Sequence, residues 1–465
     1  MRLRPNGDTG PVPTGTARSP QISWHLSRRA GGCRARCTAL CCGPYPGGVP
    51  MQLLDDNPTN EDRLGFAPTA NAIVETIRNA SRRPLTIGVF GGWGSGKTSL
   101  MQMVEARLKA QQIKTVWFNA WKYSGKEVIW NALIQTVLLT MKNDPDIIEA
   151  SRGESFKRRV IAVSQELAKY AAKVGTRLIP GGIVREEDVD ALWTALSSNV
   201  EDGSLFEFVN RFEYEFGQLV DEYANSSYLV VFIDDLDRCL PESAIEVMEA
   251  LKLYLDRANC VFVIGVEPSI IETAISLRYA ANPNLSASKY LEKIIQIPVV
   301  VPRVRTQSGL DLISSVTGDS LLARRRQLAR LIQTGMDRNP RRIKRFANAY
   351  EVALSGRPEP SADERLILAK VLVIQMRFPD FYRELTRDPG LMAKIRDVND
   401  QAAWVDAGIG QLRNDLELRR FLRRTQGILA PAEQVRPWIR VTEAVEDVDD
   451  ELAEEGPGLD TPSPP

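Results

Sequence analysis

Residues 85–98 read LTIGVF followed by GGWGSGKT, and this stretch decides the fold. The apolar run Leu85–Phe90 has the length of a buried strand, and the segment after it satisfies the pattern G-x-x-x-x-G-K-[S/T]. Glycines let the backbone wrap closely around a phosphate, and the helix that follows presents its positive N-terminal end to the anion. We therefore predict a phosphate-binding loop (P-loop, or Walker A motif) for a nucleoside triphosphate. The residues expected to bind the nucleotide are Gly91, Gly92, Trp93, Gly94, Ser95, Gly96, Lys97, Thr98 and Ser99.

Two side chains of this loop have specific expected roles. Lys97 neutralises the oxygens of the β- and γ-phosphates, and the hydroxyl of Thr98 ligates Mg²⁺. The alternative interpretation is a glycine-rich turn that binds no ligand. The context disfavours it, because a strand precedes the loop and an amphipathic pattern follows it. Apolar residues recur there at helical spacing, at Leu100, Met103, Val104 and Leu108.

A second apolar run, Tyr228–Ile233, ends in the two acids Asp234 and Asp235. We expect a strand adjacent to the P-loop strand to deliver Asp234 to the Mg²⁺ shell, as a Walker B motif does. Asp235 then polarises the attacking water as the catalytic base. Two solvated acids at a strand end are the alternative. The second acid argues against a small GTPase, and no N-K-x-D guanine-specificity motif occurs, so the expected ligands are ATP and Mg²⁺.

Three charged residues near these motifs have open interpretations. Asp237 and Arg238 form either a local salt bridge or turn, or a charge contact to the nucleotide or to a neighbouring subunit. Glu267 follows the apolar run Cys260–Val266. It is either a sensor of the γ-phosphate and the attacking water or a plain acid at the end of a strand.

Short apolar runs alternate with helical patterns from residue 85 to about residue 303. Strands of five to seven residues separated by helices predict an α/β fold, with a parallel sheet covered by helices on both faces. Expected strands are 85–90, 115–119, 228–233, 260–266 and 294–301, and residues 309–440 are predominantly helical. We expect a nucleotide-binding core at 51–303 with a polar insertion at about 143–200, a helical region at 304–440, and a disordered acidic tail at 441–465.

Composition excludes several classes of chemistry. Lys and Arg number 59 and Asp and Glu number 59, so no overall charge steers the chain to nucleic acid. The only histidine is His25, which excludes a Ser-His-Asp triad, a Cys-His pair and an H-E-x-x-H zinc site from residues 51–465. No apolar run approaches the roughly 18–20 residues that span a membrane.

Residues 1–50 differ from the rest of the chain. They contain eight Gly and seven Pro and show no helical or strand period. Such a segment buries too little apolar surface to order itself, so we expect a disordered leader that comes from an upstream choice of start codon. The alternative is a metal-binding cluster of cysteines, although its spacing matches no zinc pattern. Those cysteines are Cys33, Cys37, Cys41 and Cys42.

Several strings together resemble the KAP family of P-loop NTPases, over roughly residues 51–440. The Asp-Asp-Leu-Asp-Arg-Cys string is far more specific than the P-loop alone. The matching strings are Asp56–Pro58, Glu61–Phe66, Gly91–Thr98, Val116–Tyr123, Phe232–Cys239, Tyr290–Pro298 and Asn339–Phe346.

The resemblance implies an ATPase core of the additional-strand class, with sheet order 5-1-4-3-2 and a helical lid behind it. Many members carry transmembrane helices between the two nucleotide motifs, whereas the stretch at about 143–200 is polar here. We therefore expect a cytoplasmic protein that is at most peripheral at the membrane. Glu267 is a second departure, because the family pattern suggests Asp there, and this puts the sensor role in doubt.

The resemblance also implies further cationic site residues. By analogy with related lidded ATPases, Arg341 or Arg342 reaches the γ-phosphate as a catalytic residue. The alternatives are a solvated basic helix face and contact with nucleic acid, which the lack of interleaved aromatic residues disfavours. Arg238 and Lys293 are candidates to act on a neighbouring subunit, so we expect a homo-oligomer.

These observations lead to one function and one alternative. The first is an ATPase that turns over slowly and uses the cycle to switch conformation or oligomeric state, with a role in phage defence suggested by the family. The second is a nucleotide-bound scaffold that organises partner proteins without significant turnover. A nucleoside kinase is a weaker third interpretation, because no acceptor-site signature is found. The protein partner or effector is unknown.

Overall fold

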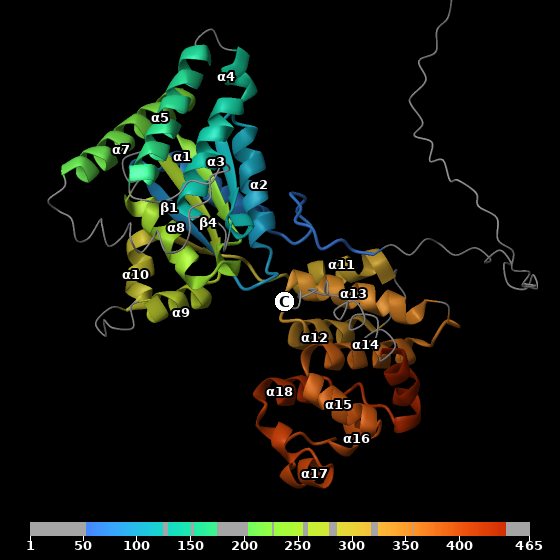
Figure 1. Ribbon diagram of the computed structural model, residues 1–465. Coiled ribbons are helices and arrows are strands. Elements are labelled where there is room, and N and C mark those ends of the chain that lie inside the picture. The colour runs from blue at the N-terminus through green and yellow to red at the C-terminus, as the bar shows by residue number, and fades with distance from the viewer. Residues whose placement is uncertain are drawn as a thin grey trace, which may run out of the picture. The chain divides into compact units, whose positions relative to one another are not determined.

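A computed structural model describes residues 53–123, 129–149, 153–173, 203–225, 227–253, 259–278, 286–317, 324–355 and 357–442 of the chain. Five parallel strands form one sheet in the order β2-β3-β4-β1-β5 (Figure 1), which confirms the order 5-1-4-3-2. Carboxyl ends of parallel strands meet at one edge, so the loops after β1 and β3 lie on the same side of the sheet. The strands are β1 (Leu85–Phe90), β2 (Thr115–Asn119), β3 (Leu229–Asp234), β4 (Cys260–Val266) and β5 (Ile297–Val300).

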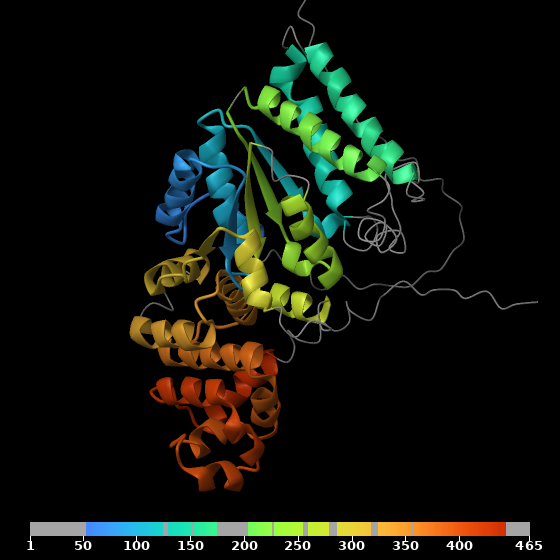
Figure 2. The ribbon, with the colours of Figure 1, turned by 90° about the vertical axis from the view of Figure 1, so that its left-hand side faces the viewer.

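Helices cover both faces of the sheet, which confirms the predicted α/β fold (Figure 2). Strand β3 shows why its sequence is a continuous apolar run. Val230 and Phe232 pack into the core with α1 and α2, whereas Val231 and Ile233 pack into the core on the other face. The helices of this region are α1 (Ala67–Asn79), α2 (Lys97–Lys109), α3 (Ile129–Asn143), α4 (Pro145–Glu149), α5 (Gly153–Lys173), α7 (Gly203–Tyr223), α8 (Pro241–Leu253), α9 (Pro268–Arg278) and α10 (Ala287–Ile294), with the 3₁₀ turns η1 (Ala120–Tyr123) and η2 (Leu236–Arg238).

The last strand is shorter than the sequence predicts. The expected strand 294–301 begins in a helix, because α10 continues to Ile294 and β5 covers only Ile297–Val300. Leu291 and Ile294 are buried by α10 at helical spacing, so the first part of the apolar run belongs to a helix face.

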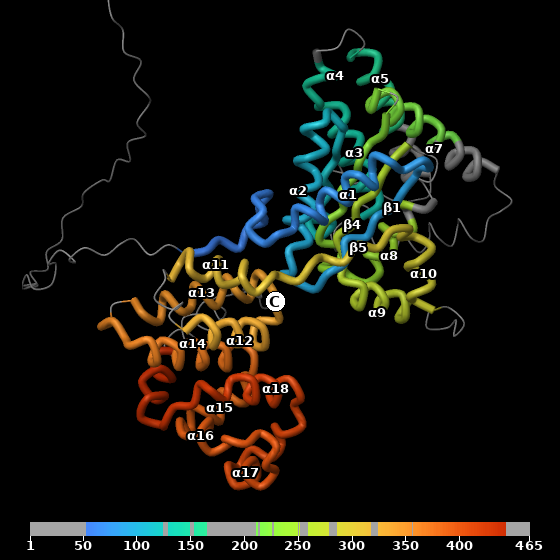
Figure 3. The backbone as a smooth tube through the Cα atoms, turned by 180° about the vertical axis from the view of Figure 1, so that it is seen from behind, coloured from blue at the N-terminus to red at the C-terminus, as the bar shows by residue number. Residues whose placement is uncertain are grey.

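The described residues after β5 form mainly helices (Figure 3). These helices have a hydrophobic core of their own. The predicted boundary at 303/304 falls between β5 and the first of these helices, and the domain division itself stays a prediction. The helices are α11 (Thr306–Thr317), α12 (Arg325–Gly335), α13 (Pro340–Leu354), α14 (Ala362–Arg377), α15 (Pro379–Arg387), α16 (Leu391–Lys394), α17 (Gln401–Asp406), α18 (Leu416–Arg424) and residues 432–442, with the 3₁₀ turn η4 (Gly410–Asn414).

Other sequence expectations fall partly or wholly outside the described residues. The leader 1–50 with its cysteine cluster lies outside them, as do 150–152 and 174–200 of the expected insertion and 443–465 of the expected tail. The helix 432–442 extends two residues into that tail, because Val441 and Thr442 are buried. None of the described helices has the length and apolar character required to cross a bilayer.

Lys370 on α14 is a buried ammonium in the core of the helical region. Its side chain donates to the carbonyl oxygens of Thr425 at 3.3 Å and Ile428 at 2.9 Å. Burial lowers the pKa of Lys370 from 10.5 to about 7. The folded protein therefore releases this proton near neutral pH, whereas the unfolded chain keeps it up to about pH 10.5.

We expect the stability of the protein to rise with pH because of Lys370. Between about pH 7 and 10.5 the unfolded state binds more protons than the folded state, so the free energy of unfolding increases. The penalty for charging Lys370 is full below pH 7 and amounts to roughly 3–5 kcal/mol from the size of the shift. Denaturant unfolding of the wild type and of Lys370→Met from pH 7 to 10 measures it. A stability difference between the two proteins that stays constant over this range would contradict the assignment.

Candidate nucleotide-binding site

The loop between β1 and α2 requires glycine at two positions. Gly94 and Gly96 have φ angles of +74° and +99°, in the left-handed region that side chains disfavour. Space is also restricted. A Cβ on Gly94 would lie 2.8 Å from Cβ of Arg341, and one on Gly96 would lie 2.7 Å from Cε2 of Phe66. The loop is thus held between the segment before α1 and the first turn of α13.

Lys97 begins α2 and points its ammonium into the site. Its Nζ donates to the carbonyl oxygen of Gly91 at 2.9 Å and forms a salt bridge with Asp237 Oδ2 at 2.8 Å. The side chains of Lys97 and Asp237 are only 8% and 4% exposed. The salt bridge of Asp237 is therefore made to the P-loop lysine, 140 positions away in the sequence, and not within its own turn. A contact of Asp237 with nucleotide or with a neighbouring subunit stays a prediction.

Thr98 and Asp234 meet at the carboxyl edge of the sheet. The hydroxyl of Thr98 donates to Asp234 Oδ1 at 3.2 Å, and Asp234 is 2% exposed. Burial raises the pKa of Asp234 to about 6, with a further contribution from the charge of Asp235. The two residue types are oxygen ligands of the kind that Mg²⁺ prefers.

The expectation that the strand carrying Asp234 lies adjacent to the P-loop strand is wrong. Strand β3 is not adjacent to β1, because β4 lies between them. Asp234 reaches Thr98 across β4 at Gly265, where a Cβ would lie 3.1 Å from Asp234 Oδ1 and 2.8 Å from the sulfur of Met101. The absence of a side chain at Gly265 is what leaves room for the carboxylate.

Asp235 is held on both of its oxygens. Its Oδ2 accepts a hydrogen bond from Asn119 Nδ2 at 2.8 Å, and its Oδ1 pairs with Arg238 at 2.9 Å. The residue has a φ of 58°, which turns the chain sharply after β3. Asn119 was not predicted as a site residue. It ends β2 opposite Asp234 in the strand register, and only the pairing of β2 with β3 brings it to Asp235.

Glu267 follows β4 and binds the backbone of the P-loop. Its carboxylate accepts a hydrogen bond from the backbone N–H of Trp93 at 3.1 Å and one from the hydroxyl of Ser269 at 3.4 Å. The contact with Trp93 stabilises the loop conformation, whereas Ser269 lies on α9, which begins directly after Glu267. The role of Glu267 as a sensor stays a prediction.

The two arginines of α13 differ in their surroundings. Asn339 caps this helix and also donates to the carbonyl oxygen of Trp93 at 2.8 Å. Arg341 pairs with Asp56 at 3.2 Å, and its guanidinium carbon lies 5.0 Å from the centroid of the Trp93 ring. Arg342 instead pairs with Asp337 and does not line the pocket. Of these two predicted catalytic residues, Arg341 is the one that the fold brings to the P-loop.

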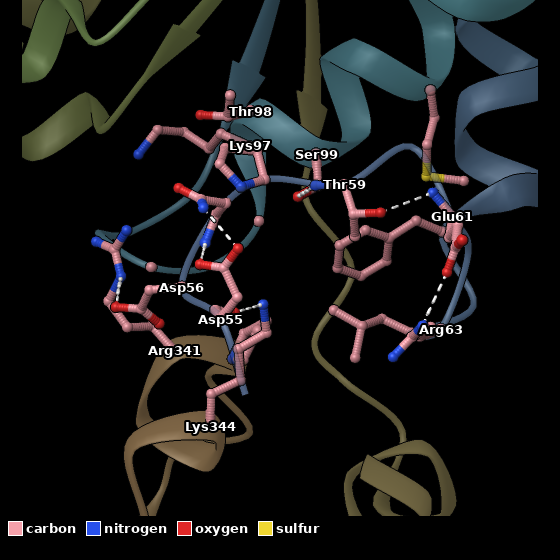
Figure 4. A pocket seen from close by; sticks show the side chains of 18 of the residues that line it. Asp55, Asp56, Thr59, Glu61, Arg63, Lys97, Thr98, Ser99, Arg341 and Lys344 are labelled. Carbon is pink, nitrogen blue, oxygen red and sulfur yellow. Dashed lines mark hydrogen bonds and ion pairs between the residues drawn. The ribbon is translucent and has the colours of Figure 1, made fainter. Parts of the chain in front are cut away.

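A pocket of about 440 Å³ lies beside the P-loop, and much of its wall comes from residues 54–66 (Figure 4). The segment has no helical or strand period, so its sequence alone predicts no role for it. Asp56–Pro58 and Glu61–Phe66 are notable only for their resemblance to the family. The lining residues include Asn57, Thr59, Leu64, Phe66, Met103, Leu312 and Pro340, beside Lys97, Thr98, Ser99, Asp235, Asp237, Arg238 and Arg341. Lys293 is exposed on α10 and is not among them.

Hydrogen bonds join the segment 54–66 to both α2 and α13. The backbone N–H of Thr59 donates to the hydroxyl of Ser99 at 3.3 Å on the P-loop helix. Asn348 of α13 exchanges two hydrogen bonds with the backbone of Leu54, at 2.7 and 2.9 Å. Lys344 also donates to the carbonyl oxygen of Asp55 at 2.7 Å, as Figure 4 shows. One segment thus contacts the P-loop helix and the helical region together.

The residues of the site fit a phosphate group with a metal ion. The buried hydroxyl of Ser95 has no hydrogen-bond partner among the described residues, so the loop retains a donor for an anion. Within that part of the chain, no group of three or more His, Cys, Asp or Glu residues could hold a metal ion. Thr98 and Asp234 are oxygen donors, and Mg²⁺ in nucleotide sites takes one or two protein ligands and completes its shell with phosphate oxygens and water.

Comparisons with known proteins agree with this geometry. The family model described as the KAP family P-loop domain matches residues 66–356. The phage T7 exclusion protein of Escherichia coli (strain K12) is 27% identical over 256 residues, which are 52% of this chain and 34% of that protein. The chain thus spans about a third of the length of this relative.

Solved structures that align with this chain include two proteins of Aeropyrum pernix. The ORC2 protein, in ADPNP–ADP complexes, is 14% identical, and the alignment covers 84% of this chain and 98% of that one, with a TM-score of 0.32. The ORC1 protein in complex with DNA is also 14% identical, with 87% and 85% covered and a TM-score of 0.32.

Proposed function

Because this chain belongs to the KAP family of P-loop NTPases, we propose that it binds ATP with Mg²⁺ and hydrolyses it slowly, as a switch of conformation or oligomeric state. The observation that carries this proposal is the meeting of three groups at one edge of the sheet. Lys97, Thr98 and Asp235 line the same pocket, and the hydroxyl of Thr98 donates a hydrogen bond to Asp234. Each is a type of group that phosphoryl transfer to water requires.

Each group has a distinct role in the proposal. The P-loop backbone and Lys97 hold the β- and γ-phosphates of the substrate. Thr98 and Asp234 hold Mg²⁺, which when bound neutralises charge on the phosphate oxygens. Asp235 orients and polarises the water that attacks the γ-phosphate.

Slow turnover follows from the contacts of Asp235. One carboxylate oxygen of Asp235 accepts a hydrogen bond from Asn119, and the other is paired with Arg238. Both oxygens are therefore less available to a water molecule. This observation also keeps the scaffold alternative in consideration, in which nucleotide is bound without significant turnover. Measured phosphate release decides between the two.

The switch would act through the contacts around Arg341. Its backbone N–H lies 3.4 Å from the carbonyl oxygen of Gly94, and its side chain contacts Asp56 and Trp93. A γ-phosphate that attracts this guanidinium would compete with Asp56 and so bias the position of α13. Arg238 and Lys293 remain candidates to reach a neighbouring subunit in a homo-oligomer.

The biological setting is proposed from the relative alone. Similarity to a protein named for exclusion of phage T7 supports a role in phage defence, in which nucleotide state controls an unknown protein effector. Comparison of phage plating on cells that carry the wild type or Lys97→Ala tests this part separately from the biochemistry.

Asp234→Asn is expected to raise the Mg²⁺ requirement without abolishing ATP binding. Asn keeps the shape of the side chain but loses the charge that faces the metal ion. Outer-shell partners alone change metal affinity about 10–100-fold, so we expect at least roughly tenfold more Mg²⁺ for half-maximal phosphate release. Titration of Mg²⁺ at fixed ATP measures this.

Glu242→Gln is the matched control for this experiment. Glu242 lies exposed in the first turn of α8, and its replacement removes one negative charge close in sequence to the site. The control should keep the Mg²⁺ requirement of the wild type. Equal requirements in Asp234→Asn and the wild type would remove Asp234 from the metal site. A wild type that neither binds nor hydrolyses MgATP would refute the proposed function itself.

A further inference from the structure

Asp237 is the third acid of the string that begins with Asp234, and the reaction described above does not use it. It lies on η2, and its Oδ2 is 2.8 Å from Nζ of Lys97. Both side chains are more than nine-tenths buried, so water screens this ion pair little. A carboxylate therefore contacts the ammonium that a P-loop lysine offers to phosphate.

Asp237 and Asp235 have different charged partners. Asp235 shares its charge between Arg238 and Asn119. For Asp237, Lys97 is the one cation within salt-bridge distance in the described part of the chain. Asp237 also lines the same pocket as the P-loop. A phosphate bound at the loop would thus bring a second anion to an ammonium that already has one.

We propose that Asp237 sets the affinity of the site for nucleotide, by competing with the phosphates for the ammonium of Lys97. This inference rests on the proposed function, since it concerns the same site. The competition is direct, because one ammonium has three N–H donors and two are already given to Gly91 and Asp237. Phosphate binding must either draw Lys97 away from Asp237 or place two anions next to one cation, and both weaken binding.

Asp237→Asn is expected to tighten MgATP binding about 10- to 100-fold. The amide keeps the size of the side chain and an acceptor oxygen, but it no longer offers Lys97 a negative charge. The same change should lower the melting temperature of the protein without nucleotide, because it leaves a buried ammonium without its counter-ion. The increase in melting temperature on adding MgATP should therefore be larger than in the wild type. A lower melting temperature without nucleotide, together with a larger increase on adding MgATP, identifies Asp237 as an anion that competes with the phosphates.

Two controls separate this explanation from a general change of charge or packing. Glu242→Gln removes one exposed negative charge on α8 and should leave MgATP affinity within about twofold, as expected for a screened surface charge. The double variant Lys97→Met/Asp237→Asn removes both members of the pair. It should be more stable without nucleotide than either single variant, because no buried charge remains unpaired.

Titration with fluorescent ATP and thermal unfolding with and without MgATP provide the measurements. Tighter binding in Asp237→Asn with wild-type affinity in Glu242→Gln is the result expected. Unchanged or weaker binding in Asp237→Asn would overturn the inference, since Asp237 would then help the lysine or the metal ion. Where Asp237→Asn does not fold, Asp237→Ser replaces it, and the stability of the double variant still tests the ion pair. A wild type that binds no ATP refutes the proposed function instead.

Discussion

Lys97→Ala is expected to abolish nucleotide binding at ordinary concentrations. The side chain is the buried cation at the P-loop, and its ammonium is held between Gly91 and Asp237. Alanine removes that charge and leaves both the phosphates and the Asp237 carboxylate without compensation in a poorly screened site. Truncation of one partner of a buried charge pair in a complex costs about 2–5 kcal/mol, which corresponds to roughly 30- to 4,000-fold weaker binding.

Titration with fluorescent ATP in the presence of Mg²⁺ measures this loss, and circular dichroism shows whether the variant is folded. The double variant Lys97→Ala/Asp237→Asn is the informative control. It removes the unpaired carboxylate as well, so it should regain thermal stability, yet the phosphates still lack a cation and binding should stay weak. Near-wild-type affinity in folded Lys97→Ala would show that the loop at 91–99 is not the phosphate site.

The sheet and the positions of the glycine-rich loop after β1 and of the acids after β3 could be predicted from the sequence, because each depends on local patterns. Leu85–Phe90 and Tyr228–Ile233 are continuous apolar runs, and both faces of the corresponding strands are covered by helices. The glycines of the P-loop are likewise a local requirement, since their backbone conformation excludes other residues. The strand order came from the family resemblance and is confirmed by the structure.

Contacts between distant segments could not be predicted in this way. Asn119 becomes a neighbour of Asp235 only through the pairing of β2 with β3, and nothing in its own sequence context indicates that partner. The role of Gly265 is similar, because it matters only once β4 separates Asp234 from the P-loop strand. Residues 54–66 contribute a pocket wall through hydrogen bonds to α2 and α13 and not through a periodic pattern. The apolar run at 294–301 misled because a helix face and a strand follow each other there.

Asp235→Asn is expected to keep ATP and Mg²⁺ bound while hydrolysis falls on the order of 10²- to 10⁴-fold, the usual contribution of a general base. Asn has the shape of Asp, so the sharp turn after β3 and the contact with Asn119 can persist. It lacks the charge that polarises a water molecule, and it can no longer form the ion pair with Arg238. Binding should stay within about threefold of the wild type, because Lys97, Thr98 and Asp234 are unchanged.

Phosphate release at saturating ATP, measured over a range of Mg²⁺, distinguishes this variant from its neighbour. Excess Mg²⁺ should restore activity to Asp234→Asn, whose defect is in metal binding, and should not restore it to Asp235→Asn, whose defect is in the reaction step. The scaffold alternative makes a different forecast, since wild type and Asp235→Asn would then both release phosphate at the same negligible rate. Release from Asp235→Asn at a substantial wild-type rate would assign the water-activating role to another group. Asp237 would then be the acid to test, because it is the remaining carboxylate of this string that lines the pocket.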